Sequence, residues 1–426
     1  MPKIQSFRYM SNLRIAAPGK TKLDGLVQLN GSKSISNRLL IIRAISGMEL
    51  EINNLSTADD TRTMVRLLKN QNELILDTGD AGTTYRFLTA YLALKNGKHF
   101  LTGSKRMMER PIAGLVSALR NLGANISYIG KEGYPPLSIN TPEFHHIKRP
   151  ELTIPSDISS QYISALLLIA PYLEKGLQLN LEGEPVSEPY IDMTLALMSE
   201  FGADINKQFN QLTIAPGKYI NKKISVESDW SAASYFYAIA ALFDGPVNLK
   251  LKTLQVYSLQ GDSIISKIMR PFGIETIFDD NGEIEIKKEK TIIPERFDYD
   301  FTNCPDLAQT LAVIVAALDI PSKLTGLKTL LFKETDRISA LKTELEKFNT
   351  QVVASENSLE IIKGIDKNLD TKTLHTVSTY NDHRMAMAFA PLTLIFGNLK
   401  MENKEVVAKS YPAFWDDLIK LGFVVK

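Results

Sequence analysis

The sequence predicts an α/β protein built from six similar units, and three observations support this prediction. Amphipathic helical stretches that end near a glycine or a small polar residue recur along the chain and run into apolar strands. The turns after these strands are rich in Gly, Asn and Asp, which supply the backbone angles of tight hairpins. The strand after such a turn, as in Gly282–Ile286, alternates apolar and polar residues. Successive copies lie roughly 50 to 80 residues apart, too far for solenoid repeats, so six units would divide naturally into two domains of three.

The elements of the six copies follow one another in the same order. The helical stretches are Met64–Leu74, Leu115–Ala124, Leu195–Ala203, Ile265–Gly273, Ile338–Asn349 and Trp415–Gly422. After the first copy, strands are expected at residues 125–128, 204–205, 274–277, 351–353 and 423–425, with turns at 130–133, 208–211, 279–282 and 355–358. A simpler explanation also stands, because glycine commonly caps helices in any α/β protein.

Composition restricts the class of function. The chain has 426 residues, 44% of them hydrophobic and 23% charged, which is typical of a globular protein. A net charge of +1 gives no overall field to attract nucleic acid or membrane. The single cysteine, Cys304, and five histidines without ligand spacing predict neither disulfides nor a metal site, as expected of a protein in a reducing cytoplasm. Residues 1–20 do not read as a signal peptide, and the longest apolar runs are far shorter than the ~20 residues of a membrane span.

Several motifs place cations and hydroxyl groups where a loop enters a helix. Gly31–Arg38 precedes an expected helix over Arg38–Ser46, and Lys33, Ser34 and Arg38 would form an anion cradle there. The alternative is an ordinary serine N-cap with surface cations. Gly79–Arg86 is a second small-residue loop before a helix expected from Arg86 to about Lys95, and an arginine at a helix start favours anion binding.

The next two motifs allow equally simple explanations. Arg106–Ile112 places two arginines before a helix that Pro111 would start, and the arginine fork suits carboxylate and phosphate. A salt-bridged loop would have the same residues. Ser159, Ser160 and Gln161 precede an apolar helix and would contact a polyol or cap that helix.

Three further motifs carry ionisable groups. Lys333–Arg337 has dense alternating charge, with Lys333 and Arg337 on one face of a helix, and a solvated face is its ordinary explanation. Tyr380–Arg384 precedes an apolar helix, where unpaired charges would be costly. Asp306 precedes the apolar run Leu311–Leu318, and by itself it reads as a helix cap.

Together these motifs point to one kind of ligand. A protein that directs several helix N-termini into one cleft is suited to hold multiple negative charges. The sequence shows no nucleotide fingerprint and no cluster of metal ligands. The substrates are therefore expected to be small anions that are handled without a metal or cofactor.

In this order, the motifs resemble those of the 5-enolpyruvylshikimate-3-phosphate synthases, from about Gly31 to Pro412. The resemblance implies a two-domain inverse α/β barrel of six βαβαββ units, three in each domain. It also implies that residues 1–31 and 227–426 form one domain, that residues 32–226 form an inserted domain, and that the active site lies between them.

The resemblance further implies an enzyme that moves the enolpyruvyl group of phosphoenolpyruvate onto the 5-hydroxyl of shikimate 3-phosphate. Glu334 would protonate C3, Asp306 would accept the hydroxyl proton and Lys33 would assist. Shikimate 3-phosphate would be held by Lys33, Ser34, Arg38, Ser159, Ser160, Gln161, Ser187, Tyr190, Asp306 and Lys333. Phosphoenolpyruvate would be held by Lys33, Gly82, Thr83, Arg110, Gln161, Arg337, Arg384 and Lys409. The two acids would need pKa values pushed apart. A cytoplasmic monomer with no cofactor and no nucleic-acid or membrane partner is expected.

The chain departs from the family pattern at Asp80, Tyr85, Phe87 and Leu331. The Asp80 carboxylate would repel an anion unless it is paired, for example with Lys33 or with loop N–H groups. Two alternatives remain. A UDP-N-acetylglucosamine enolpyruvyl transferase shares the fold but uses a reactive cysteine that Cys304 does not match in position, and a non-catalytic anion-binding protein would not need carboxylates among its cations.

Overall fold

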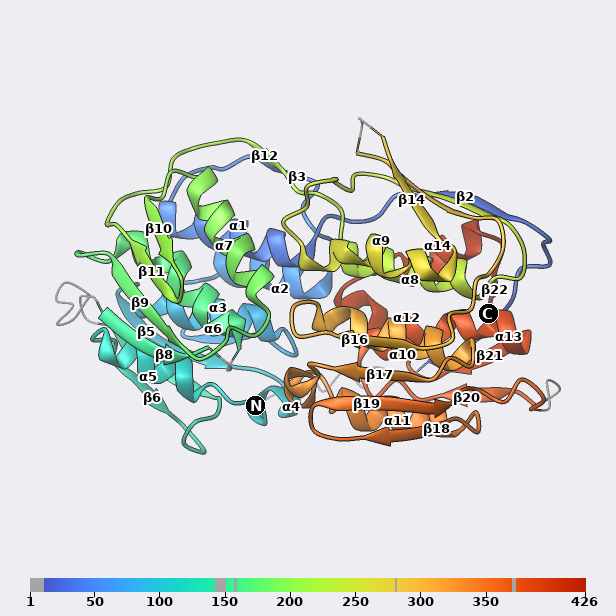
Figure 1. Cartoon of the computed structure of the whole chain (residues 1–426). Helices are drawn as coiled ribbons and strands as arrows, with labels where there is room; N and C mark the ends of the chain where they lie inside the picture. The colour runs from blue at the N-terminus through green and yellow to red at the C-terminus, as the bar shows by residue number, and fades with distance from the viewer. Residues whose placement is uncertain (1–10, 142–150, 157–158, 280–281, 370–372) are drawn as a thin grey trace.

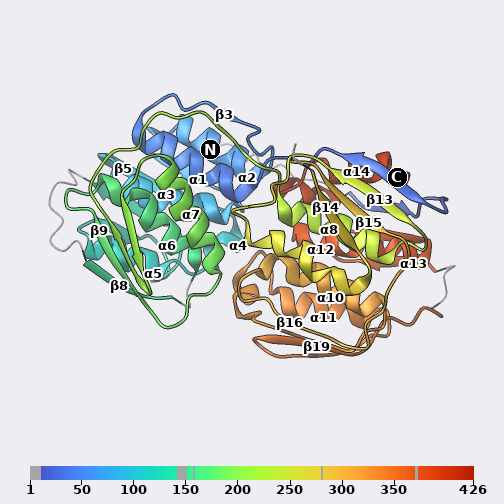
Figure 2. The same cartoon turned by 45° about the horizontal axis from the view of Figure 1, so that its top comes forward.

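The protein forms two lobes that lie side by side in the computed structural model (Figures 1 and 2). The structure describes residues 11–141, 151–156, 159–279, 282–369 and 373–426. Each lobe has its own hydrophobic core. One core collects apolar residues between Ile35 and Val226, and we call this part the insert lobe. The other collects Leu13–Leu29 and Trp230–Phe423, and we call this part the terminal lobe.

The strands form six sheets, five of four strands and one of two. In each four-stranded sheet the first two strands of the unit are parallel and two antiparallel strands complete the sheet. These two strands form a hairpin in four of the sheets, whereas in the sixth they are β1 and β22, from distant parts of the chain. In the second unit, for example, β4 pairs with β5 in the register Ile75↔Phe100, and β5 pairs with β7 in the register Phe100↔Ser138. The predicted six-unit α/β architecture is therefore confirmed.

The insert lobe contains three units. The first has β12 (Ile224–Ser225), α1 (Lys33–Ser46), β3 (Ile52–Asn53) and α2 (Asp59–Lys69). The second has β4 (Ile75–Asp77), α3 (Gly82–Ala93), β5 (Gly97–Thr102), α4 (Lys105–Met108), α5 (Ala113–Asn121), β6 (Ile126–Tyr128) and β7 (Leu137–Thr141). The third has β8 (Glu151–Pro155), α6 (Ser160–Ile169), β9 (Leu177–Glu182), α7 (Glu188–Glu200), β10 (Ile205–Gln208) and β11 (Gln211–Ile214).

The terminal lobe contains the other three. The fourth has β2 (Leu23–Val27), α8 (Trp230–Leu242), β13 (Val247–Leu251), the 3₁₀ helix η2 (Gly261–Ile264), α9 (Ile265–Ile268), β14 (Glu275–Phe278) and β15 (Ile284–Lys288). The fifth has β16 (Phe297–Asp300), η4 (Pro305–Leu307), α10 (Ala308–Ala317), β17 (Ser322–Thr325), η5 (Lys328–Phe332), α11 (Arg337–Glu346), β18 (Gln351–Ala354) and β19 (Ser358–Lys363). The sixth has β20 (His375–Val377), α12 (His383–Phe389), α13 (Thr393–Phe396), β21 (Asn398–Met401), η7 (Lys404–Lys409), α14 (Phe414–Lys420), β22 (Val424–Val425) and β1 (Leu13–Ala16).

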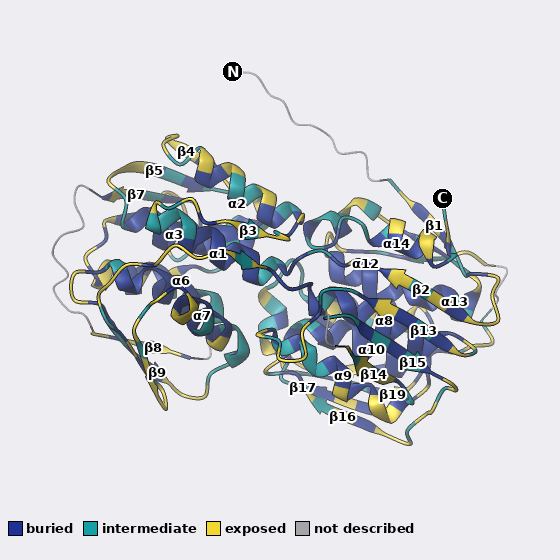
Figure 3. Ribbon diagram, turned by 90° about the horizontal axis from the view of Figure 1, so that it is seen from above, coloured by how far each residue is buried: buried dark blue, intermediate teal, exposed yellow. Residues whose placement is uncertain are grey.

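Helices fill the centre of each lobe and sheets lie outside them, as the burial colours of Figure 3 show. The helix after the first strand of each unit is the most buried one. In α6 every residue from Tyr162 to Ile169 is buried, and in α10 every residue is buried. A helix that is apolar on all sides needs cover on all sides, and sheets around it supply that cover.

The predicted helix-to-strand junctions are confirmed in five copies, where α5, α7, α9, α11 and α14 each lead into a strand. The first copy differs. The helix expected over Met64–Leu74 is α2 (Asp59–Lys69), and the strand after it, β4, opens the second unit rather than a hairpin of its own. Three helix starts were also misplaced. Helix α1 begins at Lys33, not Arg38, α3 begins at Gly82, not Arg86, and α5 begins at Ala113, after Pro111 and Ile112.

Candidate active site

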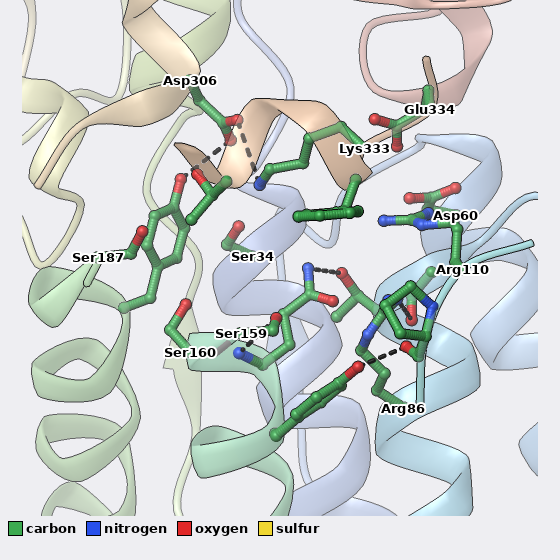
Figure 4. Close-up of a pocket in the computed structure, with 18 of the residues that line it drawn as sticks. Ser34, Asp60, Arg86, Arg110, Ser159, Ser160, Ser187, Asp306, Lys333 and Glu334 are labelled. Atoms are coloured by element: carbon green, nitrogen blue, oxygen red, sulfur yellow. Dashed lines mark hydrogen bonds and ion pairs between the residues drawn. The ribbon is translucent and has the colours of Figure 1, made fainter. Parts of the chain in front are cut away.

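A cavity of about 470 Å³ lies between the lobes and is lined by polar residues from both. In Figure 4, Ser34, Ser159, Ser160 and Ser187 lie at one end, while Arg86, Arg110 and Asp60 lie at the other. Asp306, Lys333 and Glu334 approach from the terminal lobe (Figure 4). All but one of the predicted site residues line this cavity: Lys33, Ser34, Arg38, Gly82, Thr83, Arg110, Ser159, Ser160, Gln161, Ser187, Tyr190, Asp306, Lys333, Glu334, Arg337 and Arg384.

Helix starts bring these side chains together. Lys33 and Ser34 lie in the first turn of α1, which Ser32 caps by accepting a hydrogen bond from the Ile35 backbone N–H. Ser159 caps α6 in the same way, so its role as a cap and its place in the cavity are compatible. Residues in the first turns of α1, α3 and α6 line the cavity, so the free N–H groups and the positive dipole ends of these helices lie near it.

Arg337 lies at the centre of the charged network. It is only 1% exposed, and its guanidinium contacts three carboxylates. Nε lies 2.7 Å from Asp382, Nη2 lies 2.8 Å from Glu334 and Nη1 lies 3.3 Å from Asp306. Asp382 itself caps α12, which fixes the position of the guanidinium. The solvated face expected for Lys333–Arg337 is therefore wrong.

Lys333 corrects a second expectation about the same motif. It has an extended backbone before the helix and does not share a helical face with Arg337. Its Nζ lies 3.9 Å from Asp306 Oδ1. Its extended backbone directs the Lys333 side chain towards Asp306, and the helical spacing of Lys333 and Arg337 in the sequence did not indicate this position.

Asp306 receives more cations than one carboxylate needs. Arg384 donates to its Oδ2 at 2.6 Å, and the Tyr190 hydroxyl from the insert lobe donates to the same oxygen at 3.0 Å. Burial alone would raise the pKa of Asp306, but the charges of Arg384, Lys333, Arg337 and Lys33 outweigh burial and hold that pKa below its ordinary value. Asp306 is therefore an ionised acceptor rather than a helix cap.

Glu334 is held in the same charge state. Burial would raise its pKa, but Lys409, Arg337 and Arg110 lower it well below the ordinary value. Both acids thus have lowered pKa values without substrate. The two carboxylates share Arg337, and the expectation that their environments push the two pKa values apart stays a prediction.

Lys409 is the one predicted residue outside the main cavity. It lies in the wall towards a second cavity of about 870 Å³. Its Nζ lies 3.5 Å from both Asp60 and Glu334 and donates to the Asp80 carbonyl, so it joins the two lobes. Asp60 in turn lies 3.4 Å from Lys33 Nζ.

The arginine-rich end of the cavity is built around Gly82. Burial lowers the pKa of Arg110 to about 10, which leaves it charged at neutral pH. Arg86 donates to the Gly82 carbonyl at 3.0 Å from the second turn of α3, so its expected place at the helix start is wrong although it does line the cavity. Gln161 donates to the Thr83 hydroxyl at 3.2 Å. Within the described residues, the Nε atoms of Arg86 and Arg110 and the Oε1 atom of Gln161 have no hydrogen-bond partner.

Arg38 lies at the hydroxyl-rich end but is already well bonded. Its guanidinium donates to Thr194 at 2.7 Å, to Ser164 at 3.0 Å and to the backbone carbonyls of Ser34 and Tyr190. It therefore ties α1, α6 and α7 together beneath the cavity floor. Its predicted contact with a ligand stays a prediction.

Asp80 is paired, but not with the expected partners. Its carboxylate accepts a hydrogen bond from the Ser104 hydroxyl, and it faces the second cavity rather than the main one. Tyr85 and Phe87 are buried in the core of the insert lobe, and Leu331 packs against the core of the terminal lobe. None of these departures lines the main cavity.

Sequence reasoning missed several residues at the site. Asp60 lies in the first turn of α2, where an acid is ordinary, so its sequence position gave no signal. Asp382 and His383 were seen only as part of a motif, yet Asp382 positions Arg337 and His383 lines the cavity. Burial and the nearby charges of Lys33 and Arg384 hold the pKa of His383 well below its usual range, so the ring is neutral.

Comparisons with known proteins agree on one family. The family model described as EPSP synthase (3-phosphoshikimate 1-carboxyvinyltransferase) matches residues 18–71 and 68–418. A relative from Bacteroides fragilis named 3-phosphoshikimate 1-carboxyvinyltransferase is 46% identical over 413 residues, which cover 97% of this chain and 98% of its own. The chain belongs to the EPSP synthase family.

Other members of the EPSP synthase family extend this result. A relative of the same name from Cellvibrio japonicus is 36% identical and covers 92% of this chain and 95% of its own. The solved structure of EPSP synthase from Acinetobacter baumannii superimposes with a TM-score of 0.76 at 21% identity, covering 98% of this chain and 100% of that one. The two-domain inverse α/β barrel is thereby confirmed as the fold.

Two features are absent from the part of the chain that the structure describes. No helix there is long and apolar enough to span a membrane. No group of three or more His, Cys, Asp or Glu side chains in the same residues has the arrangement of a metal site.

Proposed function

We propose that this chain transfers the enolpyruvyl group of phosphoenolpyruvate to the 5-hydroxyl of shikimate 3-phosphate and releases phosphate. One observation carries the proposal. Two partly buried carboxylates, Asp306 and Glu334, contact the same guanidinium of Arg337 and lie towards opposite ends of one cavity (Figure 4). Asp306 lies towards the hydroxyl-rich end, and Glu334 lies towards the arginine-rich end. An addition that removes a proton from an alcohol and adds one to a carbon needs two such groups.

The division of the cavity supports the placement of the two substrates. Ser34, Ser159, Ser160 and Ser187 offer hydroxyl groups to a phosphorylated polyol. The Tyr190 hydroxyl contacts Asp306 near that end, and the Lys33 ammonium extends from the first turn of α1 to Asp60. Arg110, Arg337 and Arg384 converge where a carboxylate and a phosphate would lie, and Lys409 closes that end. The unpartnered Nε atoms among the described residues, on Arg86, Arg110 and Arg384, are donors suited to such an anion.

The reaction uses both acids in the addition step. Asp306 accepts the proton of the 5-hydroxyl as the oxygen attacks C2 of phosphoenolpyruvate, while Glu334 delivers a proton to C3. In the elimination, Glu334 takes a proton back from C3, the bond between C2 and the phosphate oxygen breaks, and Asp306 returns its proton to the leaving phosphate, which restores the double bond and the starting state of both acids. Lys33, Arg110, Arg337 and Arg384 stabilise the negative charge that remains on phosphate and carboxylate throughout.

Glu334 can donate a proton only if substrate changes its environment. Without substrate, Lys409 and Arg337 keep it ionised. A bound phosphoenolpyruvate brings a carboxylate and a phosphate to the same cations, and this added negative charge raises the pKa of Glu334. Substrate binding therefore prepares the acid, and protonation before binding is not required.

Two other functions receive less support. An enolpyruvyl transferase that uses a reactive cysteine needs an accessible thiol, whereas Cys304 is 2% exposed, does not line the main cavity, and has a pKa raised by burial to about 12. A protein that only binds anions would gain nothing from carboxylates at the cationic centre, because they repel the ligand.

The proposal extends to organisation in the cell. The chain acts as a cytoplasmic monomer, and its domains meet at residues 31–32 and 226–227. Two separate hydrophobic cores support this boundary, as do an isolated bridge between Gly31 and Ser228 and a hydrogen bond from Ser32 N–H to the Glu227 carbonyl where the two connections run side by side.

Phosphate release from phosphoenolpyruvate tests the reaction, with shikimate 3-phosphate or UDP-N-acetylglucosamine as acceptor. Phosphate release is expected with shikimate 3-phosphate and not with UDP-N-acetylglucosamine. Replacing Glu334 by glutamine should keep substrate binding within a few-fold and lower kcat by at least ~10²-fold, the scale of general acid catalysis. Full activity in this variant would remove Glu334 from the role of acid, and release with the second acceptor alone would refute the proposed function.

A further inference from the structure

Asp262 is a further buried carboxyl group, which lies behind the catalytic cations and takes no part in the reaction described above. It belongs to η2 and is 3% exposed. The Ser231 hydroxyl, in the first turn of α8, donates to its Oδ2. The other oxygen, Oδ1, is buried and has no hydrogen-bond partner among the residues that the structure describes. An ionised carboxylate with one oxygen in that position would be costly.

Ser231 connects Asp262 to Arg384. Nη2 of Arg384 donates to Asp306 Oδ2 at 2.6 Å and lies 3.4 Å from the Ser231 Oγ. Nη1 lies 3.3 Å from the Tyr235 hydroxyl. The guanidinium therefore has Asp306 on one side and Ser231 with Tyr235 on the other, so two carboxyl groups act on one arginine.

The number of charges decides which carboxyl group is ionised. Asp306 contacts Arg384 and Arg337 directly and has Lys333 nearby, whereas Asp262 reaches Arg384 only through Ser231. The positive charge of the shared guanidinium neutralises the charge of the closer acid, Asp306, and the more distant acid, Asp262, keeps its proton. We propose that Asp262, acting through Ser231, is a positioning residue that holds Arg384 for phosphoenolpyruvate while it is neutral and withdraws Arg384 when it is ionised.

The surroundings of Asp262 agree with this assignment. Burial, then the negative charge of Asp306, raises the pKa of Asp262 to about 7, with Asp229 adding to the effect and both Arg384 and the hydrogen bond from Ser231 opposing it. Among the described residues, Tyr190 and Cys304 also interact with the charge of Asp262, and both have raised pKa values, so they stay neutral. The Asp229 carboxylate has its own partners, because it caps α8 and accepts a 3.1 Å hydrogen bond from the backbone N–H of Lys33.

The insert lobe supplies part of the cover over η2. A Cβ atom on Gly261 would lie 2.7 Å from Cβ of Pro189 and 3.0 Å from the Asn303 carbonyl. Pro189 belongs to α7, which also carries Tyr190. The start of α7 thus packs directly beside Asp262, so contact between the lobes helps to keep this carboxyl group out of water and protonated.

The inference rests on the proposed function, since it assigns Arg384 to phosphoenolpyruvate. It predicts a specific pH dependence. Below pH 7 Asp262 is neutral and Arg384 is free to bind the ligand. Above pH 7 the ionised Asp262 adds a negative charge and competes for Arg384, so KM for phosphoenolpyruvate rises by up to about tenfold per pH unit. KM for shikimate 3-phosphate does not follow this rise, because Asp262 touches neither substrate and Arg384 is assigned to phosphoenolpyruvate.

The experiment measures KM for phosphoenolpyruvate between pH 6 and 8.5 in the wild type and three variants. Asp262→Asn keeps the shape of the neutral acid, so its KM should match the wild type at pH 6.5 and lack the alkaline rise. Ser231→Ala cuts the connection and should raise KM several-fold at pH 6.5, with kcat within twofold. Asp417→Asn is the control. Asp417 is similarly buried and accepts a 2.6 Å hydrogen bond from the Tyr411 hydroxyl, but it does not line the cavity. This variant should keep the wild-type profile.

The outcomes separate the two claims. A wild type that releases no phosphate refutes the proposed function. If the wild type is active and its dependence of KM on pH is the same as that of Asp262→Asn, the role of Asp262 is refuted and the proposed function is not. If Asp262→Asn does not fold, Ser231→Ala decides, since an unchanged KM at every pH would refute the connection to Arg384.

Discussion

Replacing Gly82 by alanine tests how closely the arginine-rich end of the cavity is packed. A Cβ atom at this position would lie 2.5 Å from Nη1 of Arg110 and 2.8 Å from Nη1 of Arg86, whereas ordinary contacts begin at 3.4 Å. The Arg110 guanidinium must therefore move by about 0.9 Å. It has little room to do so, because Arg110 is 6% exposed and Arg86 is 5% exposed. Gly82 does not have a positive φ, so alanine strains contacts and not the backbone.

The magnitude follows from the hydrogen bond that is lost. A hydrogen bond between a charged donor and an anion contributes about 1.5–3 kcal/mol, which corresponds to a rise in KM for phosphoenolpyruvate of about tenfold to 150-fold. KM for shikimate 3-phosphate should stay within twofold, because Ser34, Ser159 and Ser160 lie at the other end. The phosphate-release assay measures both constants.

The matched control is Gly217→Ala, where an added Cβ atom meets nothing within 4 Å. It should leave both constants unchanged. If Gly82→Ala raised the two KM values equally, the damage would be general and the reasoning about Arg110 would fail. An unchanged KM for phosphoenolpyruvate would show that the guanidinium moves aside at no cost.

The remaining predictions concern charge and stability. Asp80→Asn should change KM for phosphoenolpyruvate by less than twofold in steady-state assays, because Ser104 already binds the carboxylate outside the main cavity; tighter binding would mean that the carboxylate repels the ligand. Gly31→Ala should lower the free energy of unfolding by about 1–3 kcal/mol in a urea titration, as the new Cβ atom would overlap the Asn54 carbonyl oxygen; an unchanged midpoint would contradict the packing at this crossing. The pKa of Asp262 is raised from 3.8 to about 7 on folding, so the stability that this group contributes is complete below pH 4 and is lost as pH rises to 7, by at most about 4 kcal/mol. The free energy of unfolding of Asp262→Asn should accordingly rise relative to that of the wild type between pH 4.5 and 7.5. If the denaturant midpoints of the two proteins changed with pH in parallel, Asp262 would already be ionised across this range.

The sequence predicted most strongly those features that depend on local pattern. Helix-to-strand junctions such as α11 into β18 follow from periodicity and glycine, and these were placed correctly. The start of α1 was not, because Lys33, Ser34 and Asn37 interrupt the apolar pattern on a helix whose buried face is partly polar. Periodicity cannot indicate a helix whose polar residues face a cavity instead of water.

Charge was harder to interpret than pattern. Lys333–Arg337 looks like a solvated face, and only tertiary structure shows that three carboxylates surround Arg337. Asp60 and Asp262 have the positions of ordinary helix-start acids, so nothing local distinguishes them. Their roles depend on partners from distant parts of the chain, such as Lys409 for Asp60.

The sixth sheet joins the two ends of the described chain. Strand β1 lies between β21 and β22, and Arg14 and Lys426 exchange backbone hydrogen bonds of 2.8 and 2.9 Å. During synthesis on a ribosome, β1 emerges before every other helix and strand of the fold and must wait for β22, which emerges after all of them. The insert lobe is nearly contiguous and can complete its core well before that, since domains generally fold as units during synthesis. The order of translation thus makes the terminal lobe the last to close, and with it the cavity on which catalysis depends.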